Sequence, residues 1–212
     1  MVTRRLMACA MAGTGAAVVL TVSLAASPQA GNPTPDHATT MKRSTMTTAQ
    51  KITNAMAAAP STISGKATVL DWPAKEGAAP PVLRAGTNGW SCFPDMPESQ
   101  GNDPMCLDET WMKWIDAYLS HTMPNIARVG IGYMLAPGGA WGSNTDPFAM
   151  KETPDNHWGH HQPHMMIVVP DAKTLTGVST DPANGGPYVM WAGTPYAHIM
   201  APATAPSTTS RR

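Results

Sequence analysis

The chain has 212 residues, and its 14 lysines and arginines are balanced by 14 aspartates and glutamates. A chain of this length suits one domain with additional segments. Between residues 60 and 203, however, acidic residues outnumber basic ones by thirteen to seven. This acidic balance argues against a nucleic-acid partner, because phosphate groups require a basic surface. It suits a protein that meets a small molecule, a cation or a component of the cell envelope.

Residues 1–30 are typical of an export signal peptide. Arg4 and Arg5 precede the uncharged residues 6–26, and small residues up to Ala30 offer a cleavage site. An uncleaved membrane anchor is the alternative, although glycine, serine and threonine dilute the apolar run. We therefore expect an exported protein, secreted or held in the periplasm or cell envelope, with no stable membrane span after cleavage. The arginine pair leaves the general and twin-arginine export routes both open.

Residues 31–59 are expected to form a linker with a short helix. Apolar residues recur there at helical spacing until Pro60 ends the pattern, namely Met46, Ala49, Ile52, Met56 and Ala59. The pattern leaves open whether this helix docks on the domain. A single compact domain is expected over residues 60–203, which hold all thirteen aromatic residues, and a disordered tail over 204–212.

Short strands are predicted at the start of the domain. Residues 67–72 form the first, and residues 81–93 form two more around Asn88 and Gly89. The Asn-Gly dipeptide favours a two-residue hairpin turn, since both turn positions need a positive φ. A plain loop at residues 87–90 is the alternative.

One main helix is predicted to begin at Asp103, as N-cap, with Pro104 in its first turn. Apolar residues follow at helical spacing until Pro124, and their aromatic stripe is more typical of a core than of a ligand platform. Cys106 would lie in the first turn. An exported chain favours a disulfide between Cys92 and Cys106, worth about 3 kcal/mol, over a pair of metal thiolates.

Four more strands are indicated at residues 128–135, 164–169, 188–191 and 196–200. In the first of them, Gly130 and Gly132 share one face, where another backbone, a ring or a ligand can come close. The connections are too short for parallel crossovers. The expected fold is therefore α+β, a small and mostly antiparallel sheet of about six or seven short strands with one main helix, tied by a disulfide.

Histidines concentrate in residues 156–166. Gly159 and Pro163 disfavour a helix there, so a loop is expected to carry His157, His160 and His161 into a strand that starts at His164. His198 lies on a later strand able to pair with it. Imidazole suits copper and zinc, and thioethers favour Cu(I) in this methionine-rich chain of 16 methionines. Solvated loop histidines and methionines that merely fill the core are the alternative.

Tryptophans near turns suggest a second kind of site. Trp90, Trp141 and Trp158 lie beside glycine, asparagine and aspartate, where an exposed indole can stack on a flat ligand. Filling the core is the alternative role. Local motifs for hydrolases, nucleotide-binding proteins and metalloproteases are missing from the sequence, so the protein is not assigned as an enzyme.

Several phrases together resemble a family of exported bacterial proteins with no assigned activity. The resemblance covers residues 63–200 and rests on VLRAGTNGWSCFPDMP, GNDPMCLDETWMKW, IGYMLAPGG, SNTDPF, PHMMIVVP and PYVMWAGTPYAHIM. It implies one compact domain behind a signal peptide and carries no catalytic residue. His157, His160 and His161 lie outside these phrases, which favours His164 and His198 as metal ligands.

The leading hypothesis is an exported domain that binds a small ligand or an envelope component without catalysis. The first alternative is a copper- or zinc-binding protein that uses His164 and His198, with help from the histidines at 157–161. The second alternative is a hydrolase whose catalytic residues meet only in the folded chain.

Overall fold

A computed structural model describes residues 46–75, 77–97 and 99–203. The predicted signal peptide, most of the linker and the predicted tail lie outside these residues. Within them, no helix is both long enough and apolar enough to cross a membrane.

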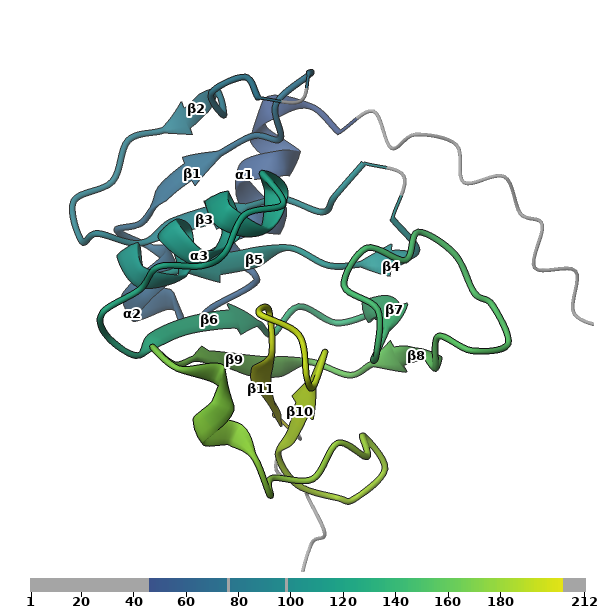
Figure 1. Cartoon of the computed structure of the whole chain (residues 1–212). Coiled ribbons are helices and arrows are strands. Elements are labelled where there is room, and N and C mark those ends of the chain that lie inside the picture. Colours follow the sequence, from purple (N-terminus) through teal and green to yellow (C-terminus); the bar gives the residue numbers. More distant parts are fainter. Residues whose placement is uncertain (1–45, 76, 98, 204–212) are drawn as a thin grey trace, which may run out of the picture. The chain divides into compact units, whose positions relative to one another are not determined.

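The fold is α+β, as predicted, with two sheets (Figure 1). The larger sheet has eight strands in the order β10 (Tyr188–Met190), β11 (His198–Pro202), β9 (His164–Val168), β6 (Gly130–Met134), β5 (Met105–Leu107), β3 (Ser91–Phe93), β1 (Thr68–Leu70) and β2 (Val82–Arg84). The smaller sheet joins β4 (Gly101–Asn102), β7 (Gly139–Ser143) and β8 (Trp158–His161). The described residues hold three α-helices, α1 (Thr48–Met56), α2 (Ser61–Ser64) and α3 (Glu109–Leu119), and one 3-10 helix, η1 (Ala172–Leu175).

The predicted six or seven strands and one main helix were therefore too few. Strands β4, β7 and β8 were missed because they are short and rich in glycine or polar residues, so they lack the apolar alternation that marks a half-buried strand.

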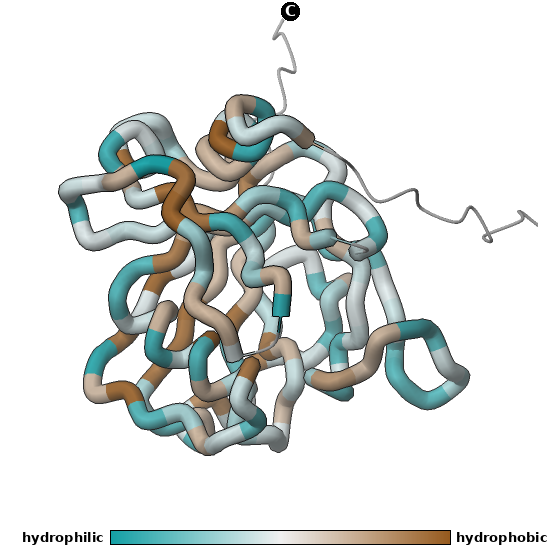
Figure 2. The backbone as a smooth tube through the Cα atoms, turned by 90° about the horizontal axis from the view of Figure 1, so that it is seen from above, coloured by the Kyte–Doolittle hydropathy of each residue, from teal (hydrophilic) through white to brown (hydrophobic). Residues whose placement is uncertain are grey.

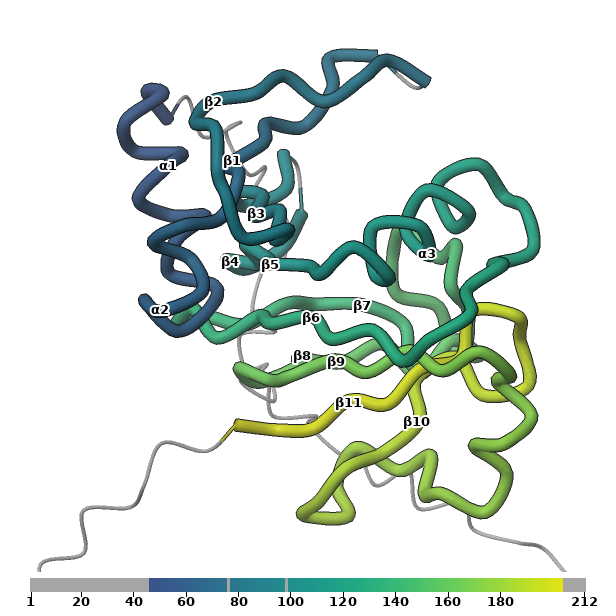
Figure 3. The backbone as a smooth tube through the Cα atoms, turned by 90° about the vertical axis from the view of Figure 1, so that its left-hand side faces the viewer, coloured from purple at the N-terminus to yellow at the C-terminus, as the bar shows by residue number. Residues whose placement is uncertain are grey.

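Helix α1 begins at a capping box. The Thr47 hydroxyl accepts a hydrogen bond from the Gln50 amide, and the Gln50 side chain accepts one from the Thr47 amide. Its apolar face is buried, with Ala55 wholly inaccessible to solvent. The helix expected at the end of the linker thus docks on the domain. Figure 3 shows α1 and α2 on one side of the large sheet and α3 on the other.

Helix α3 begins later than predicted. Asp103 and Pro104 have the composition of a helix start, yet the chain stays extended through β5. The N-cap is Asp108, whose carboxylate accepts hydrogen bonds from the amides of Trp111 (2.8 Å) and Ile131 (2.7 Å). One carboxylate therefore caps α3 and fixes it to β6.

The predicted disulfide between Cys92 and Cys106 is present, but it joins different elements. The two cysteines lie directly opposite each other on the antiparallel strands β3 and β5, not between a strand and a helix. Both are wholly buried on the α1 side of the sheet. The bond therefore ties two neighbouring strands beneath α1.

The predicted hairpin around Asn88 and Gly89 is wrong. Strand β2 pairs antiparallel with β1, and β3 pairs parallel with the other edge of β1. The segment between β2 and β3 therefore crosses over β1. Gly89 has the expected positive φ of 76°, and the Asn88 side-chain amide donates to the Ile63 carbonyl. The dipeptide therefore forms part of the crossover connection and not of a hairpin.

The glycine face of β6 lets α3 pack closely. A Cβ on Gly130 would lie 2.8 Å from Val168 and 2.9 Å from Thr110, and one on Gly132 would lie 2.9 Å from Leu107. The predicted close approach is confirmed, and its cause is packing.

The distribution of hydropathy agrees with this arrangement of the core. Hydrophobic segments gather in the interior and hydrophilic ones in peripheral loops (Figure 2).

Candidate functional site

His164 and His198 lie on neighbouring antiparallel strands of the large sheet. In the register of β9 and β11, Pro202 lies opposite His164 and Met200 lies opposite Met166. Both histidines point to the α3 side of the sheet, and each is only 2% exposed. They are part of the core.

His161 joins them from the smaller sheet. Residues 158–161 were predicted as a loop but form β8, which pairs antiparallel with β7. The alternation of this strand turns His161 inward, where it is 5% exposed, and leaves His160 exposed on the opposite face. His157 is also exposed. We call His161, His164 and His198 the buried histidine cluster.

The three rings are fixed through Nδ1. His164 Nδ1 lies 2.6 Å from the Gln162 carbonyl and His198 Nδ1 lies 3.0 Å from the Tyr196 carbonyl. A carbonyl only accepts, so Nδ1 carries the proton in both rings and Nε2 keeps its lone pair. His161 Nδ1 lies 2.9 Å from the Tyr188 hydroxyl. This is the arrangement by which proteins orient metal-binding imidazoles.

Two of the Nε2 atoms have no partner. Among the described residues, the buried side-chain nitrogen and oxygen atoms without a hydrogen bond are His161 Nε2, His164 Nε2 and Asn144 Oδ1. A buried polar atom left unpaired costs about 1–3 kcal/mol, and native proteins keep few of them. His164 Nε2 is thus free to accept a ligand, and so is His161 Nε2 in the tautomer whose Nδ1 donates to the Tyr188 hydroxyl.

Burial keeps the cluster neutral. It lowers the pKa of His164 and of His198 to about 4, and it also lowers the pKa of His161. A smaller effect in the same direction comes from the other histidines of the cluster. Near neutral pH all three imidazoles therefore have lone pairs available.

Methionine and tryptophan surround the cluster. Met190 lies directly opposite His198 on paired strands. The Met190 methyl and His161 Nε2 lie 3.8 and 3.9 Å from the point where a Cβ on Gly142 would be. Rings at 5.0 to 5.5 Å, with planes nearly perpendicular to the imidazole, enclose His198, namely Trp111, Trp114 and Trp191.

Within the part of the chain that the structure describes, no three side chains of histidine, cysteine, aspartate or glutamate are placed to hold a metal ion together. The cluster alone therefore does not make a three-histidine zinc site. Two imidazoles with a thioether are a different donor set, and the Met190 methyl and His161 Nε2 both lie near the same point above Gly142.

The three tryptophans proposed to stack on ligands do not form one site. Trp141 and Trp158 share the outer face of the smaller sheet, where Trp141 is 37% exposed and packs on His160. Trp90 packs on Tyr133, a residue of the α1-side core, and lines a separate hollow.

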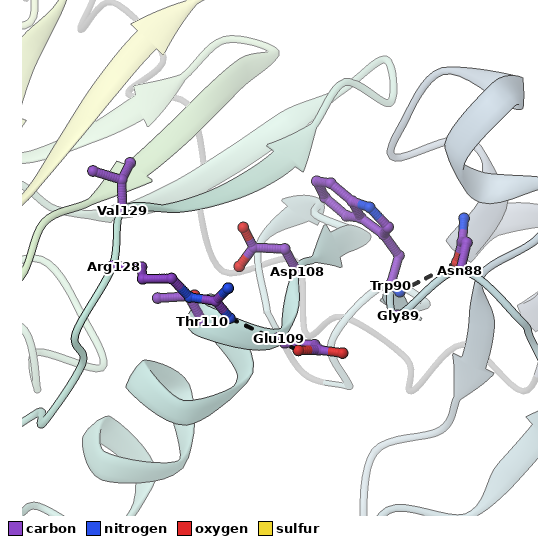
Figure 4. Close-up of a pocket in the computed structure, with 8 residues that line it drawn as sticks. All are labelled: Asn88, Gly89, Trp90, Asp108, Glu109, Thr110, Arg128 and Val129. Atoms are coloured by element: carbon purple, nitrogen blue, oxygen red, sulfur yellow. Dashed lines mark hydrogen bonds and ion pairs between the residues drawn. The ribbon is translucent and has the colours of Figure 1, made fainter.

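That hollow, of about 270 Å³, lies at the N-terminus of α3 (Figure 4). Trp90 lines it together with Glu109 and Arg128, whose charged groups are 4.0 Å apart. A larger hollow of about 620 Å³ lies between η1 and the turn after β10. None of the predicted site residues lines the larger one.

Sequence reasoning missed Tyr188 and Met190, and it gave Trp191 no role beside the histidines. Trp191 has a φ of 57°, an uncommon backbone conformation for a bulky residue. It is held there by hydrogen bonds from its amide to the Asn144 carbonyl and from its indole to the Ser143 carbonyl. The available signal was the YVMW run beside YAHIM, which places a methionine and a tryptophan next to His198.

No family model matches the chain, and no curated protein or solved structure is significantly similar to it. The resemblance to exported bacterial proteins therefore stays a prediction. Within the described residues, no serine hydroxyl is hydrogen-bonded to a histidine, so the hydrolase hypothesis gains no support from the geometry.

Proposed function

We propose that the protein is an exported, non-catalytic copper-binding protein that holds one Cu(I) ion at the buried histidine cluster. The observation that carries this proposal is the pair of buried, unpartnered Nε2 atoms of His161 and His164. Met190 is a soft donor on the same side of Gly142 as His161, and His198 lies opposite Met190. Thioether and imidazole together select Cu(I).

Charge also favours a monovalent ion. The groups that shift the pKa values of the three histidines are burial, backbone carbonyls and the other histidines, and they include no carboxylate. A neutral donor set leaves the charge of the ion uncompensated in the core. The cost of removing an ion from water rises with the square of its charge, so Cu(I) is favoured over zinc.

The disulfide supports the exported location. Disulfides form and persist outside the reducing cytosol, and Cys92–Cys106 is buried beneath α1. The apolar segment after Arg4 and Arg5 supports the same location.

The test is an anaerobic titration of untagged, exported protein with Cu(I), in competition with a chromophoric Cu(I) chelator. We expect one equivalent to bind. In a His164→Asn/His198→Asn variant, the asparagine Nδ2 can replace Nδ1 as donor to the same carbonyls, while the Nε2 ligands are lost. Affinity should fall by at least about a hundredfold, the loss typical when ligation is disturbed.

The matched control is His157→Asn/His160→Asn, which removes the same number of imidazoles from the exposed surface. It should bind Cu(I) as the wild type does. A second variant, Met190→Leu, keeps the apolar volume and should weaken Cu(I) while leaving the thermal unfolding midpoint little changed. Equal affinity in wild type and in the His164→Asn/His198→Asn variant would disprove the site.

A second candidate function is the binding of a small zwitterion, such as a free amino acid, in the hollow at the N-terminus of α3. Glu109 and Arg128 offer opposite charges, and the half-buried Trp90 offers a ring face. Tryptophan fluorescence and calorimetry with amino acids test it. Binding should depend on both charges and be lost in Glu109→Gln and in Arg128→Gln.

A further inference from the structure

Five aromatic rings lie nearly parallel beside the buried histidine cluster. Neighbouring rings are tilted by 13° or less, with centroids 4.1 to 6.2 Å apart. We call them the aromatic stack, and its members are Trp114, Trp191, Tyr118, Phe148 and His121. They come from α3, from the residues after it, from the β7–β8 loop and from the turn after β10.

The stack runs from the core to the surface. At its inner end, the indoles of Trp114 and Trp191 meet His198, with centroids 5.4 and 5.0 Å away. At its outer end, Phe148 is 38% exposed and packs on the exposed ring of His121. No saturated side chain interrupts the sequence of ring contacts between His198 and solvent.

Two members of the aromatic stack have left-handed backbone conformations. Trp191 has a φ of 57° and His121 a φ of 53°. Such conformations cost about 1–3 kcal/mol and persist when the surroundings impose them.

We propose that the aromatic stack carries single electrons between the buried histidine cluster and an outer-sphere one-electron oxidant, such as an oxidised metal complex or metalloprotein, at the surface. The copper end of this relay rests on the proposed function. The oxidant takes one electron from an indole and is reduced, leaving an indole radical cation. Cu(I) then returns one electron to the indole and becomes Cu(II), so no bond breaks and no proton leaves.

The hydrogen bonds suit tryptophan as the carrier. The Trp191 indole N–H donates to the Ser143 carbonyl, a group that does not take up the proton, so the radical stays a cation that is reduced back readily. The Tyr118 hydroxyl likewise donates to the Pro147 carbonyl and has no base to receive its proton. Tyr118 therefore acts as a ring bridge between Phe148 and the indoles.

The experiment is flash oxidation of the full-length mature protein by photogenerated ruthenium(III) tris-bipyridine, with the indole radical followed by transient absorption. It is run on copper-free protein and on protein incubated with Cu(I). The variants are Trp114→Phe/Trp191→Phe, which removes both carriers, and Phe148→Leu, which breaks only the exposed end and leaves the core intact. Every protein also carries Trp141→Phe, because Trp141 is 37% exposed outside the stack and would be oxidised directly, and Trp90→Phe is the control for an indole outside the stack.

In copper-free protein with an intact stack we expect an indole radical whose yield falls in the double variant and in Phe148→Leu, but persists in Trp90→Phe. With Cu(I), the radical should decay faster and a Cu(II) resonance should appear. Radical formation through the stack without binding or oxidation of copper would uphold the relay and refute the proposed function. A radical yield unchanged in the double variant would overturn the relay, whatever copper does.

Discussion

The cores on the two faces of the large sheet differ in amino-acid composition. On the α1 side, the core consists of small apolar residues and the disulfide, and its wholly buried members are Ala55, Ala58, Ala67, Val69, Cys92 and Cys106. On the α3 side, the core consists of large aromatic rings and methionines, with three histidines buried among them. The same strands carry both sets on alternate residues.

The faces also differ in how well their polar atoms are satisfied. Arg84 on the α1 side is held by carbonyls of Ser64 and Ala67 at 2.6 and 2.8 Å. The α3 side keeps two imidazole nitrogen atoms unpartnered and a tryptophan at positive φ. The α3 side therefore departs from the packing and hydrogen-bonding rules that the α1 side follows, and such departures are expected at functional sites. Four experiments can break or sharpen this contrast.

The largest effect is expected from acid acting on the α3 side. The pKa of His164 and of His198 is about 4 in the fold, against 6.5 in the unfolded chain. The unfolded state therefore binds more protons below pH 6.5, and stability present above that pH is lost as the pH falls toward 4. The loss should reach roughly 3 kcal/mol for each histidine by pH 4.

Urea unfolding at pH 7 and at pH 4.5 measures this loss. In His164→Asn/His198→Asn the difference between the two pH values should shrink, because asparagine takes up no proton. The control His157→Asn/His160→Asn should keep the wild-type difference. An equal acid loss in all three proteins would show that the α3 side is no more acid-sensitive than the rest of the molecule.

The second effect is expected on the α1 side. Replacing both cysteines, Cys92→Ala/Cys106→Ala, should lower the free energy of unfolding by about 3 kcal/mol, because the unfolded chain regains the entropy of an open loop. Equilibrium urea unfolding measures the loss. Cu(I) affinity should stay unchanged, since both cysteines face away from the histidine cluster. A fall in Cu(I) affinity along with the loss of stability would contradict the expectation that the α1 side stabilises the fold and the α3 side binds copper.

The third effect concerns the junction of the two sheets, where Asp103 is 8% exposed. Burial, with a further contribution from the neighbouring Asp95, raises the pKa of Asp103 to about 7. The proton that stabilises the folded state is lost as the pH rises through that value. Asp103→Asn mimics the protonated carboxyl, so its unfolding free energy should exceed the wild type's by about 1–3 kcal/mol at pH 9.

At pH 5 the advantage of Asp103→Asn should be smaller than at pH 9, because wild-type Asp103 is still protonated in the fold and the unfolded chain loses its proton above 3.8. Asp103→Ala removes the group that accepts from the Met96 amide at 2.9 Å and should be less stable at both pH values. An advantage of Asp103→Asn that does not grow with pH would show that the carboxyl is charged in the fold.

The sequence predicted correctly those strands that a local apolar pattern alone determines. Residues 130–134 form a strand where alternation predicted one, residues 164–168 form a strand where a short apolar run indicated one, and Gly130 and Gly132 admit α3 as expected. The prediction failed where local helix-start composition and long-range strand pairing favour different structures. Asp103-Pro104 has the composition of a helix start, but pairing with β3 keeps β5 extended, and Asp108 caps α3 instead. Such pairing depends on residues distant in sequence, which local composition does not encode.

The candidate site was predicted in part for the same reason. His164 and His198 were placed on strands that do pair, because each strand has its own local pattern. The strand that carries His161 has no apolar alternation of its own. Its partner β7, with two glycines and a tryptophan in five residues, offers no strand pattern either. The role of Trp191 depends on a positive φ, which nothing in the YVMW run announces.

The smallest effect is expected at His121, where backbone and ring oppose each other. His121 occupies the left-handed position after α3, and the Thr122 amide donates to the Ala117 carbonyl in the motif that usually has glycine there. His121→Gly removes about 1 kcal/mol of strain but also the stacking on Phe148, worth a similar amount. Thermal unfolding should therefore change little. In a Phe148→Leu background the ring has lost its partner, and His121→Gly should stabilise by about 1 kcal/mol. Equal stabilisation in both backgrounds would mean that the outer ring pair contributes nothing, and that the α3 side tolerates this strain without any return from stacking.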